Sequence, residues 1–263
     1  MCNIEKFPIW RVTREGKRHT DDLVTRELPL TIILNNRELV SLLCSPTEQK
    51  YLAVGFLSSE GIVKDKDDIN SITVDNQRGV VRVEVKEDKK SANELISKHF
   101  ITSGCGRGTS FYNVVNVQGQ TKVESQTVMS ALEILSLVKE FQQYSQIYRA
   151  TGGVHSAALC NTKRILAFTE DIGRHNAIDK IFGRCLLEGM PTEDHIIITS
   201  GRITSEILLK VFRRNIPIIV SKSAPTDMGI RLASDLGITL VGFVRGKRMN
   251  VYTNDWRIVS DGE

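Results

Sequence analysis

The chain has 263 residues, of which 41% are hydrophobic and 25% are charged, and its formal net charge is +4. This is the composition of an ordinary globular protein that is long enough for one or two domains. The sequence contains no run of about 18 apolar residues, so we expect no membrane-spanning helix. The first residues form no apolar signal core, which predicts a cytoplasmic protein. Lys and Arg are not concentrated into a patch with a nucleic-acid-binding motif, which argues against a nucleic-acid partner.

The first half, residues 1–125, is predicted to form a small mixed α+β domain. Four of its segments have the apolar or alternating pattern of β-strands: 30–34, 39–43, 72–74 and 80–85. The turn-prone pair Asn35-Asn36 joins the first two of these strands. Ser45 is the expected N-cap of a helix that ends near Gly61.

A Gly-rich segment near the end of this domain carries one cysteine, in Ile101-Thr-Ser-Gly-Cys105-Gly-Arg-Gly108. Glycines on both sides of Cys105 predict an exposed loop. Backbone N–H groups and Arg107 near the sulfur would favour the thiolate, so Cys105 is a candidate nucleophile. An ordinary loop with an idle or buried cysteine is the alternative interpretation. The polar residues 109–125 are a plausible hinge to the second domain.

The remaining cysteines offer little chemistry. They are Cys2, Cys44, Cys160 and Cys185. No two cysteines of the chain have CxxC spacing, so we expect neither a disulfide framework nor structural zinc. Cys44, Cys160 and Cys185 lie among apolar residues and are expected in the core. The pattern fits a reducing compartment and a protein without an intrinsic metal.

The second domain is predicted to span residues 126–263 and to begin with an amphipathic helix capped by Thr127. Strands are then expected at 156–160, 164–169, 196–199, 217–221 and 238–244. Helices are expected at 176–187, 205–212 and 227–236. Alternation of this kind favours a largely parallel sheet with helices on both faces, an α/β fold.

Small polar and cationic residues follow successive strands of this domain. Ligands of open α/β sheets bind beyond the carboxyl ends of the strands, where helix N-termini suit phosphate. The sequence therefore predicts a binding site for a phosphate-bearing ligand. Its candidate residues are Thr199, Ser200, Gly201, Arg202, Ser221, Lys222, Ser223 and Arg245. None of these loops is a Walker A sequence or a GxGxxG fingerprint, which disfavours ordinary NTPase or dinucleotide chemistry.

Two histidines and two acids lie in nearby loops and leave several interpretations open. His155 and His175 could be metal ligands, bases, phosphate contacts or satisfied structural groups. Glu170 and Asp171 could form an acid pair, or they could hold Arg174 and cap the helix that follows.

Several segments, in the expected order from about residue 9 to the C-terminus, resemble the FdhD/NarQ family of formate dehydrogenase accessory sulfurtransferases. In the second domain they are Thr151-Gly-Gly-Val-His155, Glu170-Asp-Ile-Gly-Arg-His-Asn-Ala177, Thr199-Ser-Gly-Arg202, Ser221-Lys-Ser-Ala-Pro225 and Arg245-Gly246. In the first domain they are Leu52-Ala-Val-Gly-Phe-Leu57 and Ser59-Glu-Gly-Ile62.

The resemblance implies a homodimeric sulfur carrier whose second domain has a cytidine-deaminase-like three-layer α/β/α fold. Such proteins take sulfur from a cysteine desulfurase as a persulfide, which Cys105 would hold here. They deliver it to the molybdenum cofactor of formate dehydrogenase, bound as molybdenum bis(molybdopterin guanine dinucleotide). The segment that would bind this cofactor comprises Phe243, Val244, Arg245, Gly246, Lys247 and Arg248.

The sequence departs from the family in one position, because the family loop commonly reads Cys-x-x-Cys and Gly108 stands at the second cysteine. A dithiol relay is therefore disfavoured, although one thiolate suffices to hold one sulfane sulfur. Zinc deaminase chemistry is also disfavoured, because His155 is followed by Ser156 and Ala157 and the chain has no Pro-Cys-x-x-Cys. The alternative function is that of a non-catalytic chaperone that binds the cofactor and docks with the dehydrogenase.

Overall fold

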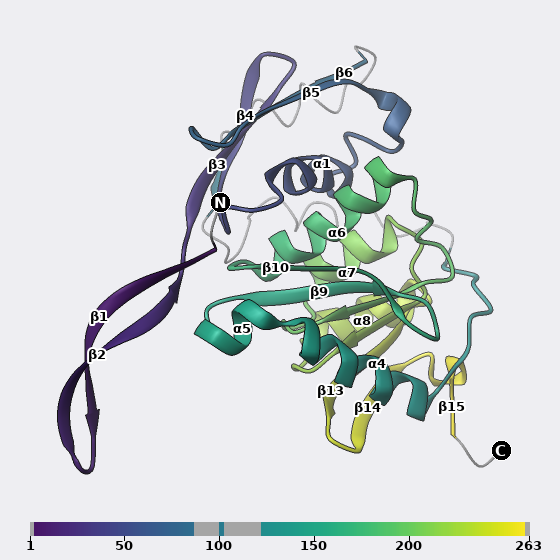
Figure 1. The fold of residues 1–263 in the computed structure, drawn as a ribbon. Helices are drawn as coiled ribbons and strands as arrows, with labels where there is room; N and C mark the ends of the chain where they lie inside the picture. Colours follow the sequence, from purple (N-terminus) through teal and green to yellow (C-terminus); the bar gives the residue numbers. More distant parts are fainter. Residues whose placement is uncertain (1–2, 87–99, 103–121, 261–263) are drawn as a thin grey trace.

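The computed structural model describes residues 3–86, 100–102 and 122–260, and Figure 1 shows their arrangement. Two larger sheets organise these residues. The first has the strand order β5-β6-β3-β4-β7, and the second has the order β10-β9-β11-β12-β13-β14. No helix in the described part of the chain is both long and apolar enough to cross a membrane.

The first sheet and one helix form the N-terminal layer. Its elements are β3 (Leu28–Leu34), β4 (Arg37–Cys44), α1 (Gln49–Ser59), η1 (Lys66–Asp68), β5 (Ile69–Asp75), β6 (Val80–Val85) and β7 (Phe100–Thr102). The predicted strands are confirmed, and Asn35 and Asn36 both hold positive φ in the predicted turn. Leu30, Ile32 and Leu34 alternate into a core that α1 covers.

The expected N-cap of α1 is wrong. The helix begins at Gln49, and its N-cap is Glu48, which has left-handed backbone geometry. Ser45 is fully buried and is bonded to Asp171 and Ile172, more than 120 residues further along the chain. A long-range partner therefore replaces the local cap that the sequence pattern indicates.

The second sheet carries helices on both faces. Its strands are β9 (His155–Cys160), β10 (Ile165–Asp171), β11 (Ile196–Thr199), β12 (Ile218–Ser221), β13 (Thr239–Arg245) and β14 (Arg248–Thr253). Its helices are α4 (Ala131–Tyr144), α5 (Gln146–Thr151), α6 (Arg174–Glu188), α7 (Ser205–Phe212) and α8 (Asp227–Asp235). Apolar side chains of α6, α7 and α8 pack against one face and those of α4 against the other. This is the expected three-layer α/β/α arrangement.

Two details of this domain differ from the sequence-based expectation. The sheet is mixed, because β11, β12 and β13 are parallel neighbours whereas β9 and β14 run the other way. The cap of α4 is Ser130, not Thr127, and it exchanges hydrogen bonds with Glu133 in a capping box. Both hydroxyl residues precede the apolar stripe, and only Ser130 has an acid three residues later.

Helix α1 lies against α6, so the two predicted domains share a buried contact (Figure 1). The helices cross at Gly55 and Gly183, where their backbones touch. Beside this crossing, Asp179 binds Lys210 at 2.6 Å and accepts a hydrogen bond from Ser59 at 2.5 Å. The domain boundary near residue 125 stays a prediction, while this contact shows that the two parts pack as one body.

A buried arginine holds the segment that precedes α4. Arg257 in η2 (Asp255–Arg257) is 1% exposed and donates to the carbonyl oxygens of Val123, Ser125 and Gly237. The adjoining strands β8 (Met129–Ser130) and β15 (Ile258–Val259) pair in parallel. The C-terminal residues therefore hold the start of the second domain in place.

Strands β1 (Ile4–Thr13) and β2 (Gly16–Thr25) form a long hairpin that the local sequence pattern did not predict. The hairpin extends away from the body of the molecule (Figure 1). Charged and apolar residues alternate on both of its faces, so the pattern does not identify one buried side. Its base is held by Thr25, which is hydrogen-bonded to Thr151 of α5 at 2.8 Å.

Candidate functional site

A cavity of about 760 Å³ opens at the edge of the second sheet where β10, β11, β12 and β13 end and β9 begins. Helices α4 and α5 form its other wall. Its lining residues are Phe141, Gln142, Ser145, Tyr148, Arg149, Gly152, Gly153, Val154, His155, Ser156, Ile172, Ser200, Lys222, Ser223, Arg245 and Gly246. The sequence-based expectation that these loops converge is therefore met for His155, Ser200, Ser223 and the two cations Lys222 and Arg245.

The cavity is electropositive. Arg149, Lys222 and Arg245 line it, and no Asp or Glu is among the lining residues that the structure describes. Burial and the nearby Arg245 guanidinium lower the pKa of Lys222. Two cations that repel each other without a carboxylate between them are a suitable setting for an anionic ligand, which would relieve that repulsion.

His155 and Ser200 form a polar pair in the wall. Ser200 Oγ accepts a hydrogen bond from the Ser156 N–H at 2.9 Å and lies 3.3 Å from His155 Nδ1. Burial and the positive charge of Arg174 lower the pKa of His155, which favours the neutral form of the imidazole. Arg174 Nε is itself buried and has no hydrogen-bond partner among the described residues. Arg174 is not among the described residues that line the cavity.

Buried hydroxyl groups shape the loops that follow β11 and β12. Ser221 Oγ donates to the Gly201 carbonyl at 2.7 Å and accepts from the Ser223 N–H at 2.9 Å. Thr199 Oγ1 accepts from the Gly201 N–H at 3.2 Å. Thr199, Gly201 and Ser221 are buried and do not line the cavity, so they support the loops that carry the lining residues.

The residues of segment 243–248 lie in three different environments, because some line the cavity, some are buried in the core and some are exposed to solvent. Phe243 has φ 52, uncommon for an aromatic residue, and its N–H donates to the Ser223 carbonyl. Its ring lies 5.6 Å from the Arg245 guanidinium. Val244 is buried in the core beneath α4, whereas Lys247 is exposed in the turn and Arg248 is exposed at the start of β14. Arg245 and Gly246 are therefore the members of this segment that reach the cavity.

Two further candidates lie outside the cavity lining. Arg202 is exposed, although its charge also lowers the pKa of His155. His175 lies in the first turn of α6 with Nε2 3.6 Å from Glu206 Oε2. The structure therefore places His175 beside an acid of α7 rather than beside the lining cations.

Glu170 and Asp171 do not form an acid pair, since neighbours in a strand point to opposite faces. The Glu170 carboxylate accepts the N–H groups of Ile147 and Tyr148 at 3.1 and 3.0 Å and so orients α5, while its burial raises its pKa. Asp171 accepts the Gly173 N–H in the turn before α6. The two carboxylates therefore hold the backbone of segments that line the cavity and do not line it themselves.

The sequence pattern did not predict that α4 and α5 form part of the cavity wall, to which they contribute Phe141, Tyr148 and Arg149. The Gly152-Gly153 pair, directly after α5, was the one sequence feature that pointed to this wall.

Cys105, Arg107 and Gly108 lie outside the described residues. Strand β7 ends at Thr102, which pairs with Leu42 of β4. The described part of the chain contains no cluster of His, Cys, Asp and Glu suited to a metal ion, and the expected absence of an intrinsic metal stays a prediction.

The fold and the site define an α/β protein with a cationic cavity at the edge of its larger sheet. Residues 25–259 match the FdhD/NarQ family, and the chain belongs to that family. It is 42% identical over 250 residues to the sulfur carrier protein FdhD of Bacillus subtilis (strain 168), which covers 95% of each chain.

Two further comparisons agree. The sulfur carrier protein FdhD of Listeria monocytogenes serovar 1/2a is 45% identical over 241 residues, covering 89% of this chain and 91% of the relative. The crystal structure of a protein from Desulfotalea psychrophila, described as a putative formate dehydrogenase accessory protein, matches with a TM-score of 0.81 and 29% identity. That match covers 98% of this chain and 100% of the other.

Proposed function

We propose that this protein is a cytoplasmic sulfur carrier that serves formate dehydrogenase. It receives sulfur from a cysteine desulfurase as a persulfide on Cys105 and transfers it to the molybdenum bis(molybdopterin guanine dinucleotide) of the dehydrogenase. The observation that carries the proposal is the cavity, whose described lining has three cations and no carboxylate and so suits the phosphates of this substrate. The names of the relatives, sulfur carrier proteins, supply the reaction class.

The chemistry of the cysteines supports Cys105. Cys44, Cys160 and Cys185 are all buried. Burial raises the pKa of Cys44 to about 12 and that of Cys185 to about 11, and it raises the pKa of Cys160 as well. These thiols are protonated at neutral pH and are poor nucleophiles. Cys105, flanked by glycines, is the better candidate by its sequence setting.

The transfer needs no external oxidant at the loading step. The Cys105 thiolate attacks the outer sulfur of the desulfurase persulfide, and a new S–S bond forms on Cys105. The S–S bond of the donor breaks, and the donor cysteine leaves as a thiolate. In delivery, the outer sulfur would form a bond to the molybdenum of the substrate while the S–S bond breaks and Cys105 leaves as a thiolate. The two electrons that convert this sulfane sulfur to sulfide would come from the reduced molybdenum of the substrate, which is itself oxidised. One cysteine is sufficient for both steps, which accommodates Gly108.

Cys105→Ser is expected to abolish transfer, because a hydroxyl group cannot form a persulfide. We would measure the sulfur gained by the protein after incubation with a desulfurase and cysteine, using mass spectrometry, and the activity of a formate dehydrogenase matured with the variant. Cys2→Ser, which leaves Cys105 in place, is the control and should retain transfer. A fully active dehydrogenase matured with Cys105→Ser would instead favour the chaperone, the second candidate function.

The cavity makes its own prediction, that Lys222→Ala and Arg245→Ala each weaken guanosine diphosphate binding. The expected loss is about 1–3 kcal/mol, or about 5- to 150-fold in Kd, if the contacts are charge-assisted. Lys247→Ala is the matched control, because Lys247 has the same charge, lies two residues from Arg245 and is exposed in the turn. Calorimetry that finds the same affinity in all three variants would remove the phosphate assignment.

We also propose a homodimer. The support is the β1–β2 hairpin, because a two-stranded hairpin alone is marginally stable in water. Trp10 is 59% exposed and Val12 is 71% exposed on this hairpin, with Phe7, Leu23 and Val24 also exposed. A second copy of the chain would cover these side chains in a symmetric contact.

A further inference from the structure

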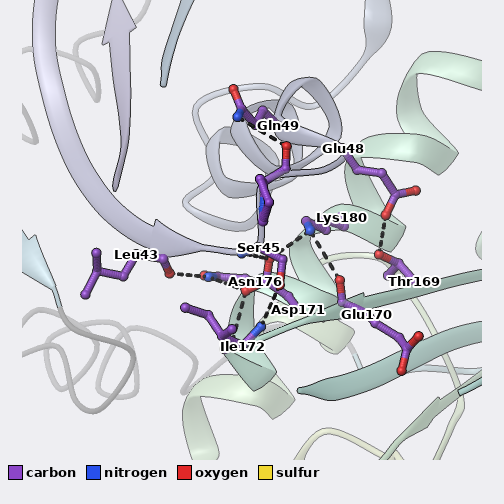
Figure 2. Close-up of polar contacts among 12 residues, drawn as sticks. Leu43, Ser45, Glu48, Gln49, Thr169, Glu170, Asp171, Ile172, Asn176 and Lys180 are labelled. Atoms are coloured by element: carbon purple, nitrogen blue, oxygen red, sulfur yellow. Dashed lines mark hydrogen bonds and ion pairs between the residues drawn. The ribbon is translucent and has the colours of Figure 1, made fainter. Parts of the chain in front are cut away.

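A buried polar network lies beneath the turn between β10 and α6 (Figure 2). Its centre is Asp171, whose side chain is fully buried and lies 2.8 Å from the equally buried Lys180 Nζ. Lys180 also donates to the Glu170 carbonyl at 3.3 Å. Neither Asp171 nor Lys180 lines the cavity, so the centre of the network lies outside the cavity lining described above.

The network reaches across to the end of strand β4. Asn176 Nδ2 donates to Asp171 Oδ1 at 2.9 Å and to the Leu43 carbonyl at 2.8 Å. The Ser45 N–H donates to Asp171 Oδ2 at 3.1 Å, and the Ile172 N–H donates to Ser45 Oγ at 3.2 Å. Figure 2 shows these contacts joining β4 to the β10–α6 turn. The bonds to Ser45 and Leu43 connect segments that are at least 126 residues apart.

The network ends beside the cavity on one side and beside the β4–β7 strand pair on the other. At one end, Ile172 lines the cavity. At the other end, Leu43 follows Leu42, which pairs with Thr102 of β7. Cys105 comes three residues after Thr102, a distance that extended chain spans in at most about 11 Å. The network therefore joins the cavity wall to the strand pair from which the chain continues to Cys105.

Stability alone does not account for a polar network at this place. Replacing a buried ion pair by well-packed apolar residues is often neutral or stabilising, because both charges lose their hydration. Directional hydrogen bonds instead fix the relative position of the segments that they join. A separate hydrogen bond, from Thr169 Oγ1 to Glu48 Oε2 at 2.6 Å, joins β10 to the start of α1 and does not involve β4. It therefore serves as a comparison for the bonds that reach β4.

We propose that Asn176, held by Asp171, is a positioning residue that fixes the β4–β7 pair relative to the cavity wall. Delivery of sulfur from Cys105 to the ligand in the cavity depends on that position, whereas loading of Cys105 by the desulfurase does not. This inference rests on the proposed function.

The test compares Asn176→Ala with Thr169→Val, which removes the bond between β10 and the start of α1 and leaves the bonds to the end of β4 in place. In Asn176→Ala, hydrogen exchange at residues 40–44 and 100–102 is expected to accelerate about tenfold, as the loss of one buried hydrogen bond predicts. Persulfide formation on Cys105, measured by mass spectrometry, should stay near the wild-type level. Delivery, measured as the rate at which the loaded sulfur leaves Cys105 for cofactor-bearing dehydrogenase, should fall by a similar factor. Thr169→Val should leave all three measurements near wild type.

Several results would overturn the proposal. Normal delivery by Asn176→Ala despite faster exchange would show that position does not limit transfer. Parallel loss of loading and delivery, with faster exchange throughout the chain, would assign a structural role instead. If Asn176→Ala does not fold, Ser45→Ala removes the acceptor of the Ile172 N–H and should produce the same pattern more weakly. If the wild-type protein loads no sulfur, the proposed function fails, while the exchange comparison still decides whether Asn176 holds β4 in place.

Discussion

Gly55→Ala is expected to lower the free energy of unfolding by about 3 kcal/mol, at the upper end of the usual cost of overpacking. A Cβ atom at position 55 would overlap the Asp179 carbonyl oxygen of α6 and lie 2.8 Å from the Gly183 nitrogen. Both atoms belong to the backbone, so no side chain can rotate to make room. The helices α1 and α6 would have to separate, and the buried Ser59–Asp179–Lys210 contacts lie beside them.

Urea unfolding of the purified variants measures this effect. Gly183→Ala should cost a similar amount, because its Cβ would overlap the Tyr51 carbonyl oxygen from the opposite side of the crossing. Lys50→Ala, an exposed change on the same helix, is the control and should shift stability by no more than about 0.5 kcal/mol. A Gly55→Ala protein as stable as this control would show that the helices do not make backbone contact.

Lys180→Met is the second change with a large expected effect, a loss of about 3–5 kcal/mol in the free energy of unfolding. The side chains of Lys180 and Asp171 are both fully buried, so the substitution leaves a carboxylate without its cation. Its bonds from Ser45, Gly173 and Asn176 remain, which favours the lower end of the range.

A double-mutant cycle isolates the pair. Lys180→Met combined with Asp171→Asn should lose less stability than Lys180→Met alone, because the uncompensated charge is gone. Lys139→Met repeats the same chemical change at an exposed position of α4 and should have little effect. Equal losses in the single and double variants would mean that the two charges are not coupled.

Much of the second sheet could be predicted from local pattern. Short segments such as Ile196–Thr199 and Ile218–Ser221 are buried on both faces, so they are apolar up to their last residue. Polar residues directly after them lie at one edge because the strands share a direction. The same reasoning predicts that Ser200 and Lys222 lie at a common site, and both line the cavity.

Local pattern failed where a partner lies far away in the sequence. Ser45 has the spacing of a helix cap, but its bonding partners are Asp171 and Ile172. The hairpin of β1 and β2 has no buried face within the described part of the chain, so its residues show no single apolar stripe. The wall formed by α4 and α5 was missed for the same reason, since Glu170 orients α5 from another element.

By itself, the sequence determined the α/β class, the strands of the second sheet and the polar loops at their ends, because these depend on periodicity and on neighbours along the chain. Only the tertiary structure decided which loop residues share one cavity, that Val244 belongs to the core, and that Asp171 serves as a link between distant segments. Long-range contacts decided these points because a side chain's role follows from the atoms that surround it, and backbone topology brings those atoms together from segments more than 100 residues apart.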